Sequence, residues 1–288
     1  MKHLLNFQNI EKQELEKLID TTLKIETNNS EKINSYALMK FDEGSTRTRL
    51  SFSLAAKKSG IEIVEITDLI SAKSKGEDLQ HEIETYKALG IEILVIRTKE
   101  NNFQDYENIN DLSVISAGFG NSSHPTQAII DVATLEKFKK FNRDIPITYV
   151  GDLKHSRVFA SGRELLGKLG FKVGVYASDE LLPDDLSNLQ IYNSWEEVVS
   201  ETGAIELLRV QKERIEDIQE FNFEQYIKQF QISKQILDNS PDDLIVLHPM
   251  PINIGIEYLK KHLFIINSST KNNFVWELHQ ELPLTSSH

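Results

Sequence analysis

The sequence predicts an α/β fold with two doubly wound, parallel-sheet domains and an active site in the cleft between them. Three observations support this. Short apolar runs alternate with segments of helical spacing along most of the 288 residues, as is typical of parallel sheets with right-handed crossovers. A charged, proline-ended stretch at 139–146 separates two such series, which places the domains at residues 1–140 and 141–288. Polar residues collect at the ends of the predicted strands in both series.

In the first half, the alternation starts after one amphipathic helix, in which Leu15, Leu18 and Leu23 recur among charged residues. Gly60 ends a later helix, and Pro125 stands at a helix start, where proline is tolerated. The predicted helices are 10–25, 50–59, 78–89 and 125–138, and the predicted strands are 36–41, 61–67, 91–96 and 112–117.

The second half repeats the alternation. Gly151 forms the turn after its first strand, and Gly170 closes the helix that follows. The predicted strands are 147–150, 172–176, 204–208 and 244–247. The predicted helices are 155–169, 195–199, 223–237 and 271–282, and the last of these could pack back on the first domain.

The composition excludes several classes of protein. A formal net charge of −12 argues against nucleic-acid binding, which needs a basic surface. The absence of cysteine excludes disulfides, thiolate metal ligands and cysteine nucleophiles. No apolar run approaches the roughly 18 residues of a membrane span. The first residues do not resemble a signal peptide, so we expect a cytoplasmic protein with no membrane partner.

The stretch FDEGSTRTRL at 41–50 has the composition of an anion-binding turn. A strand that turns through Gly44 into a helix leaves unpaired backbone N–H groups at the positive end of the helix dipole. Three hydroxyls and two guanidinium groups suited to phosphate follow: Ser45, Thr46, Thr48, Arg47 and Arg49. The alternative is a Ser/Thr helix cap followed by solvated arginines.

Polar residues follow the predicted strands at six places drawn from both halves. These places are 45–49, Arg97, His124, Arg157, Arg209 and the turn at 248–251. In parallel α/β sheets, ligands bind at this edge of the sheet. The pattern predicts a cleft for a ligand with several negative groups, lined by Arg47, Arg97, Arg157 and Arg209.

Taken singly, these residues have ordinary structural interpretations. Arg97 could pair with Glu100, and His124 could bond the backbone of its own helix. The run RVQKER at 209–214 has the mixed charge of an exposed helix. The segment at 118–123 resembles the front of a dinucleotide-binding loop but lacks its third glycine, and no His-x-x-x-His pair is present. We therefore expect no cofactor and no metal ion.

Five segments together resemble the aspartate/ornithine carbamoyltransferase family, in the family's order and over nearly the whole chain. They are STRTR at 45–49, SAKSKGE at 71–77, HPTQ at 124–127, GDLKHSR at 151–157 and RVQKER at 209–214. The Arg-x-Gln segment and HPMP at 248–251 are similar to the aspartate branch rather than the ornithine branch. Ile254 and the segment 267–276 depart from the family's pattern, which carries arginines there.

The resemblance implies transfer of a carbamoyl group from carbamoyl phosphate to the amino group of L-aspartate. The products would be N-carbamoyl-L-aspartate and phosphate, in an early committed step of pyrimidine (UMP) synthesis. It also implies a homotrimer that shares each site across an interface. An ornithine-type transferase and a catalytically silent scaffold are the alternatives, and a regulatory chain or partner enzyme stays open.

The resemblance further implies roles for the matching residues. Carbamoyl phosphate would be bound by Ser45, Thr46, Arg47, Thr48, Arg97, His124, Gln127, Met250 and Pro251. Aspartate would be bound by Lys75, Arg157, Arg209 and Gln211. The adjacent subunit would supply Ser71 and Lys75. The expected catalytic residues are Arg47, Thr48, Lys75, Arg97 and His124. Since both substrates are anions, cations are needed to bring them together.

Overall fold

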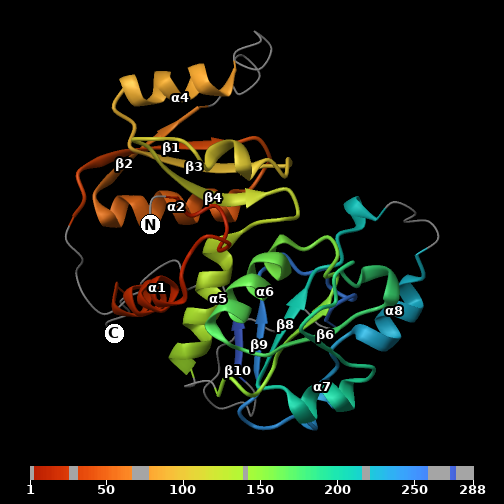
Figure 1. Cartoon of the computed structure of the whole chain (residues 1–288). Helices are drawn as coiled ribbons and strands as arrows, with labels where there is room; N and C mark the ends of the chain where they lie inside the picture. The colour runs from red at the N-terminus through yellow and green to blue at the C-terminus, as the bar shows by residue number, and fades with distance from the viewer. Residues whose placement is uncertain are drawn as a thin grey trace, which may run out of the picture.

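The computed structural model contains two parallel sheets with helices on both faces of each, which confirms the predicted fold class (Figure 1). It describes residues 3–25, 32–66, 78–138, 142–215, 221–258 and 273–276, with the backbone alone at 25 and 273–276. The first series of elements is α1 (Lys12–Ile25), β1 (Ser35–Phe41), α2 (Thr46–Ser59), β2 (Ile61–Glu65), α4 (Leu79–Ala88), β3 (Ile93–Thr98), η1 (Phe103–Tyr106), β4 (Ser113–Phe119) and α5 (Pro125–Phe138). The second series is β5 (Ile147–Gly151), α6 (Arg157–Leu169), β6 (Val173–Tyr176), η2 (Asp179–Leu181), β7 (Leu189–Ile191), α7 (Trp195–Glu201), β8 (Ala204–Leu208), η3 (Lys212–Arg214), α8 (Phe223–Phe230), α9 (Lys234–Asp238), β9 (Ile245–His248) and β10 (Asn273–Trp276).

The first sheet has the strand order β2-β1-β3-β4, and all its strands are parallel. Successive side chains of a strand face opposite sides. Leu38 of β1 therefore packs in one core cluster with Ile83 of α4, whereas Met39 packs in another beside Phe52 of α2. Figure 1 shows α4 and α2 on opposite faces of this sheet.

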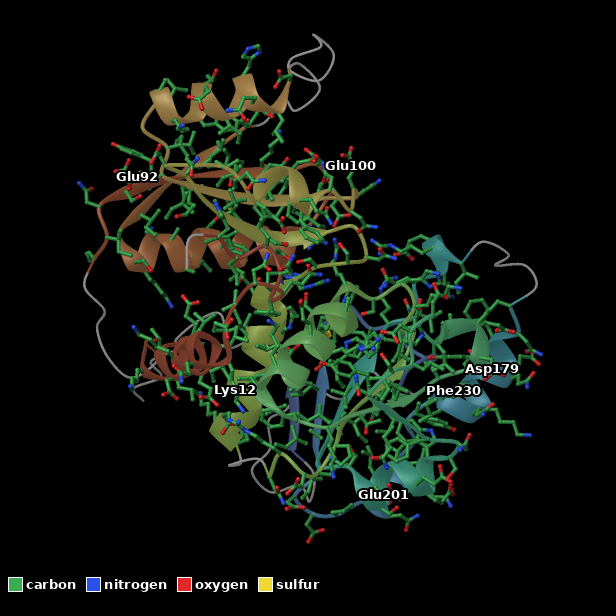
Figure 2. All side chains as sticks on the ribbon, in the orientation of Figure 1. Lys12, Glu92, Glu100, Asp179, Glu201 and Phe230 are labelled. Carbon is green, nitrogen blue, oxygen red and sulfur yellow. The ribbon has the colours of Figure 1, made fainter. Side chains whose placement is uncertain are left out.

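The second sheet has the order β10-β9-β8-β5-β6-β7 and is also parallel. One face, with Ile147 and Leu247, packs against α1, α5 and α6. The other face, with Ile205, packs against Trp195 of α7 and Phe230 of α8. Figure 2 shows exposed residues such as Glu92, Glu100 and Glu201 at the periphery of the molecule.

Helix α5 connects the two sheets, because it follows β4 of the first sheet and packs on the second. Ala128 and Val132 of α5 are fully or almost fully buried in the same cluster as Leu165 of α6. α5 also contacts α1, and α1 contacts α6. In Figure 1 these three helices lie along the second sheet and below the first. No helix in the described segments is both long enough and apolar enough to cross a membrane.

Each sheet has a topological switch point at its centre. From β1 the chain crosses first to β2 on one side and later to β3 on the other side. From β5 it likewise crosses first to β6 on one side and later to β8 on the other. Ligands bind at such points, beyond the carboxyl ends of the strands. The segments that leave β1, β3, β5 and β8 carry Arg47, Arg97, Arg157 and Arg209.

Two helix predictions differ from the structure. Residues 273–276, inside the helix predicted at 271–282, form β10 beside β9; the sequence Asn-Phe-Val-Trp is rich in strand-forming side chains, which explains the difference. The rest of that predicted helix lies outside the described residues. The helix predicted at 223–237 is divided into α8 and α9, because Ile232 pairs with Tyr258 and Ser233 caps a new helix.

Candidate active site

The turn between β1 and α2 forms one wall of a cavity of about 310 Å³. Ser45 stands at the N-cap position of α2 in an extended conformation (φ −156°, ψ 95°), but its side chain makes no capping hydrogen bond. The helix does not use this hydroxyl as a cap, and Ser45, Thr46 and Thr48 all line the cavity. Of the two arginines, Arg47 lines this cavity, whereas Arg49 extends toward Glu65 and the ring of Phe41. The geometry favours the anion-site interpretation over a simple helix cap.

Arg97, at the end of β3, reaches this turn. Its Nη1 donates to the carbonyl of Ala117 at 3.0 Å and to Thr48 Oγ1 at 3.4 Å. Its Nη2 lies 2.7 Å from Glu43 Oε1, so its ion pair is with Glu43 rather than Glu100. Burial, and then the charge of Arg157, lower the pKa of Arg97 to about 10. The guanidinium is still charged near neutral pH, and the contribution of Arg157 shows that two cations lie close together here.

Glu43 joins the two halves of the cavity. Its Oε1 also accepts from Arg157 Nη2 at 2.5 Å, and Arg157 begins α6 in the second half. Burial lowers the pKa of Arg157, and the Glu43 charge opposes this effect. One carboxylate thus serves two arginines, which leaves the cavity with unbalanced positive charge and makes it suitable for anions.

His124 begins the segment that leads into α5 and is almost fully buried. Its backbone N–H donates to Ser161 Oγ at 2.8 Å. Burial, followed by the charges of Arg157 and Arg97, holds the pKa of His124 well below its ordinary value. The ring is therefore neutral near pH 7 and can donate from one of its nitrogens. One helical turn later, Gln127 Nε2 donates to Asp131 Oδ1 at 2.9 Å.

The second half contributes Arg209 and Gln211 from the segment after β8. Arg209 pairs with Glu213. Gln211 is held in place at both ends: its backbone N–H donates to Asp152 Oδ2 at 2.9 Å, and its Nε2 donates to the carbonyl of His155 at 2.7 Å. The adjacent α6 is capped by its own N-terminal serine, which accepts from the N–H three residues on.

The turn after β9 completes the cavity. His248 Nδ1 accepts from the backbone N–H of Met250 at 2.9 Å, which fixes the turn. Burial, and then the charges of Arg209 and Arg47, lower the pKa of His248 to about 3, so the ring is neutral. Met250 has a left-handed backbone (φ 55°), and Pro251 follows a cis peptide bond. Pro249, Met250 and Pro251 all line the cavity.

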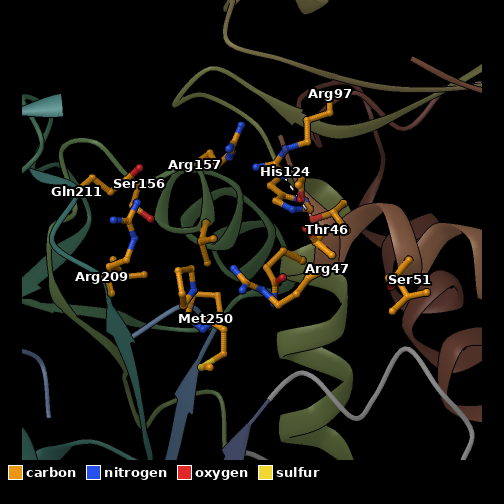
Figure 3. Close-up of a pocket in the computed structure, with 18 of the residues that line it drawn as sticks. Thr46, Arg47, Ser51, Arg97, His124, Ser156, Arg157, Arg209, Gln211 and Met250 are labelled. Atoms are coloured by element: carbon orange, nitrogen blue, oxygen red, sulfur yellow. Dashed lines mark hydrogen bonds between the residues drawn. The ribbon is translucent and has the colours of Figure 1, made fainter. Parts of the chain in front are cut away.

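Twelve of the predicted site residues line this one cavity: Ser45, Thr46, Arg47, Thr48, Arg97, His124, Gln127, Arg157, Arg209, Gln211, Met250 and Pro251. Figure 3 shows Thr46, Arg47 and Arg97 on one side and Arg209 and Gln211 on the other. Ser71 and Lys75 lie outside the described residues. No group of three or more histidines or carboxylates suited to a metal ion occurs in the part of the chain that is described.

Sequence reasoning missed the acidic residues of the site. Glu43 stands inside the 41–50 stretch, whose predicted ligand groups are hydroxyls and cations. Asp152 is fully buried and orders the second half through Gln211 and His155. Asp131 holds the amide of Gln127. The available signal was position: each lies within four residues of a predicted ligand-binding residue or motif.

Comparisons with known proteins agree with this geometry. Residues 2–137 match the family model described as aspartate/ornithine carbamoyltransferase, carbamoyl-P binding domain, and residues 143–262 match the model for the Asp/Orn binding domain. The chain is 34% identical to the aspartate carbamoyltransferase catalytic subunit of Malacoplasma penetrans (89% of this chain, 86% of the relative). It is 32% identical to that of Staphylococcus carnosus (89% and 85%).

Solved structures give the same result. The catalytic subunit of M. jannaschii aspartate transcarbamoylase superposes with a TM-score of 0.76 at 27% identity, covering 98% of this chain and 95% of that one. Aspartate transcarbamoylase from Trypanosoma cruzi in complex with carbamoyl phosphate has a TM-score of 0.81 at 23% identity, covering 97% and 92%, and supports the fold alone.

Proposed function

Since the chain belongs to the aspartate/ornithine carbamoyltransferase family, we propose that it transfers the carbamoyl group of carbamoyl phosphate to L-aspartate, giving N-carbamoyl-L-aspartate and phosphate. The observation that carries the proposal is a single cavity lined by cationic side chains of both sheets. A phosphate dianion and a dicarboxylate can be brought together only where cations offset their charges.

The phosphate of carbamoyl phosphate is held by the N-terminus of α2, with the hydroxyls of Ser45, Thr46 and Thr48 and the guanidinium of Arg47. The unused capping hydroxyl of Ser45 supports this role, because it is available to a ligand. Fourteen residues make α2 long enough to present a full helix dipole to the anion.

The carbonyl oxygen of the carbamoyl group is polarised by Thr48, Arg97 and His124. Supporting this, Arg97 Nη1 and Thr48 Oγ1 lie only 3.4 Å apart, so both can reach one oxygen. As the aspartate amine attacks, negative charge grows on that oxygen. Donors fixed in advance stabilise this charge, and removing one typically costs about 10²–10³ in rate. Phosphate leaves without the need for a covalent enzyme intermediate.

The carbamoyl NH₂ group is oriented by Gln127 and by the backbone carbonyls of Met250 and Pro251. The turn that carries these carbonyls is fixed through His248, which supports a positioning role.

Arg157, Arg209 and Gln211 bind the two carboxylates of aspartate. Support comes from the two hydrogen bonds that hold Gln211 rigid. A cationic pair beside an amide suits a dicarboxylate better than the side-chain amine of ornithine, which favours aspartate as the acceptor.

Three further elements of the proposal come from the family resemblance and from the sequence. The chain forms a homotrimer, and Ser71 and Lys75 of an adjacent subunit complete each site. The domains divide near residue 140. The reaction takes place in the cytoplasm, as an early step of pyrimidine synthesis.

The test is product formation by the purified full-length chain. We expect carbamoyl-aspartate from carbamoyl phosphate and L-aspartate, and little product when L-ornithine replaces aspartate. Faster carbamoylation of ornithine would reverse the acceptor assignment. No product from either amine, in protein that is folded and of trimer size, would support a catalytically silent scaffold instead.

A further inference from the structure

Glu206, in the middle of β8, is a buried carboxyl group that the proposed reaction does not use. Only 1% of the Glu206 surface is exposed to solvent. Neither of its oxygens has a hydrogen-bond partner within the described segments. A carboxyl group placed in an apolar interior without a partner costs free energy, so its presence needs an explanation.

Glu206 lies on the face of β8 that packs against α5. Ala204 and Leu208, two residues to either side, belong to the core cluster that contains Ala128 of α5. Residues two apart on a strand share a face, so Glu206 faces α5 as well. There the buried carboxylate of Asp131 acts on it: burial first, and the charge of Asp131 second, raise the pKa of Glu206 well above its ordinary value.

The residues paired with Glu206 on the neighbouring strands contribute one other titratable group. Its cross-strand neighbours are Tyr149 of β5 and Leu247 of β9. Both belong to the same buried cluster. Tyrosine is neutral below a pH of about 10, so the charge at this place is determined by the two carboxyl groups.

Asp131 connects Glu206 to the cavity through Gln127, whose Nε2 donates to Asp131 Oδ1 at 2.9 Å. An ionised Asp131 can only accept hydrogen bonds, so it requires the nitrogen of the Gln127 amide. The carbonyl oxygen then occupies the opposite branch of the amide. A protonated Asp131 could donate instead and would allow the amide to turn over.

Two neighbouring buried carboxyl groups cannot both ionise, so one holds a proton. Asp131 receives a hydrogen bond that stabilises its charged form, whereas Glu206 receives none in the described part of the chain. The proton therefore belongs on Glu206.

We propose that Glu206 is a positioning residue: its protonated carboxyl group donates a hydrogen bond to Asp131, keeps Asp131 ionised and so fixes Gln127 with its carbonyl oxygen toward the carbamoyl group. This inference rests on the proposed function for the identity of the ligand. The charge state of the pair does not depend on that identity.

The kinetic test uses variants of the full chain. Without a hydrogen-bond donor at position 206, Asp131 becomes a poorly stabilised buried anion and takes up a proton itself. Glu206→Leu should then lower kcat/KM for carbamoyl phosphate about tenfold, the value of roughly one hydrogen bond. Glu206→Gln, neutral and polar, should recover most of this loss. Glu164→Gln, which removes a partly buried acid that bonds the backbone of Phe7, is the matched control and should change kcat/KM less than about twofold.

A double variant separates positioning from a general structural effect. Glu206 acts through Gln127, so Glu206→Leu should change kcat/KM less than about twofold in a Gln127→Ala background. Equal tenfold losses in both backgrounds would overturn the proposal.

A measurement independent of activity covers the case in which Glu206→Leu does not fold. Glu206 ionises in the unfolded chain near its ordinary pKa of 4.5 but stays neutral in the folded protein. Its stabilising effect is thus complete below pH 4.5 and is lost as pH rises toward the raised folded pKa. The urea midpoint of Glu206→Gln should match that of wild type at pH 4 and exceed it increasingly up to pH 8. A difference between the two urea midpoints that does not change with pH would contradict a protonated Glu206 in the folded protein. If wild type made no carbamoyl-aspartate, the proposed function would fail, while this difference would still decide the charge state.

Discussion

A Glu43→Gln substitution tests the ion pairs that join the two halves of the cavity. Glu43 Oε1 lies 2.7 Å from Arg97 and 2.5 Å from Arg157, and the three side chains are only 11–14% exposed. Glutamine keeps the shape of the side chain but removes the charge, so two nearly buried guanidinium groups lose their shared counter-ion. Removing one partner of a buried ion pair costs about 3–5 kcal/mol, and we expect about 3 kcal/mol because some solvent reaches these groups.

The assay is urea unfolding at pH 7 in a buffer without phosphate. Glu213→Gln is the matched control, since it removes the carboxylate paired with Arg209. That carboxylate is 57% exposed, so its loss should cost less than about 1 kcal/mol. Adding carbamoyl phosphate should restore more stability to Glu43→Gln than to wild type, because the ligand replaces the lost negative charge. Equal losses in the two variants, or a smaller ligand effect in Glu43→Gln, would contradict the reasoning.

Three other substitutions give independent tests. Arg47→Ala should lower kcat at least about 10²-fold and leave the urea unfolding midpoint unchanged. Arg49 does not line the cavity, so the kcat of Arg49→Ala should stay within about threefold of wild type. Similar kcat values for the two variants would contradict the assignment of Arg47 to the phosphate site. The pKa of His248 is lowered to about 3, so the unfolded chain takes up its proton first as pH falls below 6.5, and stability is lost there by about 1.4 kcal/mol per pH unit. His248→Asn should show a shallower loss in thermal melts between pH 6.5 and 4.5, and parallel slopes would refute the assignment. Lys40→Met should lower the free energy of unfolding by about 3–5 kcal/mol, since Glu82, 2.5 Å away, loses its counter-ion in a buried place. The double variant Lys40→Met/Glu82→Leu should recover most of this loss in urea unfolding. No recovery would show that the loss does not come from a buried charge without a counter-ion.

The sequence predicts the fold and the cationic part of the cavity well, because both depend on local patterns. Alternating apolar runs identify strands and helices, and the position of a residue just after a strand identifies the edge where ligands bind. Arg97, Arg157 and Arg209 were found in this way, and they do line one cavity. Their individual roles stay predictions.

The roles of the acidic groups could not be predicted, because they depend on the three-dimensional arrangement. Glu43 and Arg157 are 114 residues apart in the sequence, and nothing in either segment indicates the pair. Glu206 is an acidic residue in a strand that is otherwise apolar and fully buried. The alternation of apolar residues predicts the strand but not why a carboxyl group is buried in it.

The misassigned segments have the same cause. Residues 273–276 form a strand because β9 offers a free edge, and the division between α8 and α9 depends on the contact of Ile232 with Tyr258. In the first case strand-forming residue types meet a sheet edge, and in the second a tertiary contact overrides the local helical spacing.

The central claim is that one cleft holds both substrates, with carbamoyl phosphate on the first half and the dicarboxylate on the second. A crystal structure of the chain with carbamoyl phosphate and succinate, an aspartate analogue without the attacking amine, tests it most directly. We expect the phosphate group at Ser45–Thr48 and the succinate carboxylates at Arg157 and Arg209. Density for either ligand elsewhere, with this cavity empty, would contradict the claim.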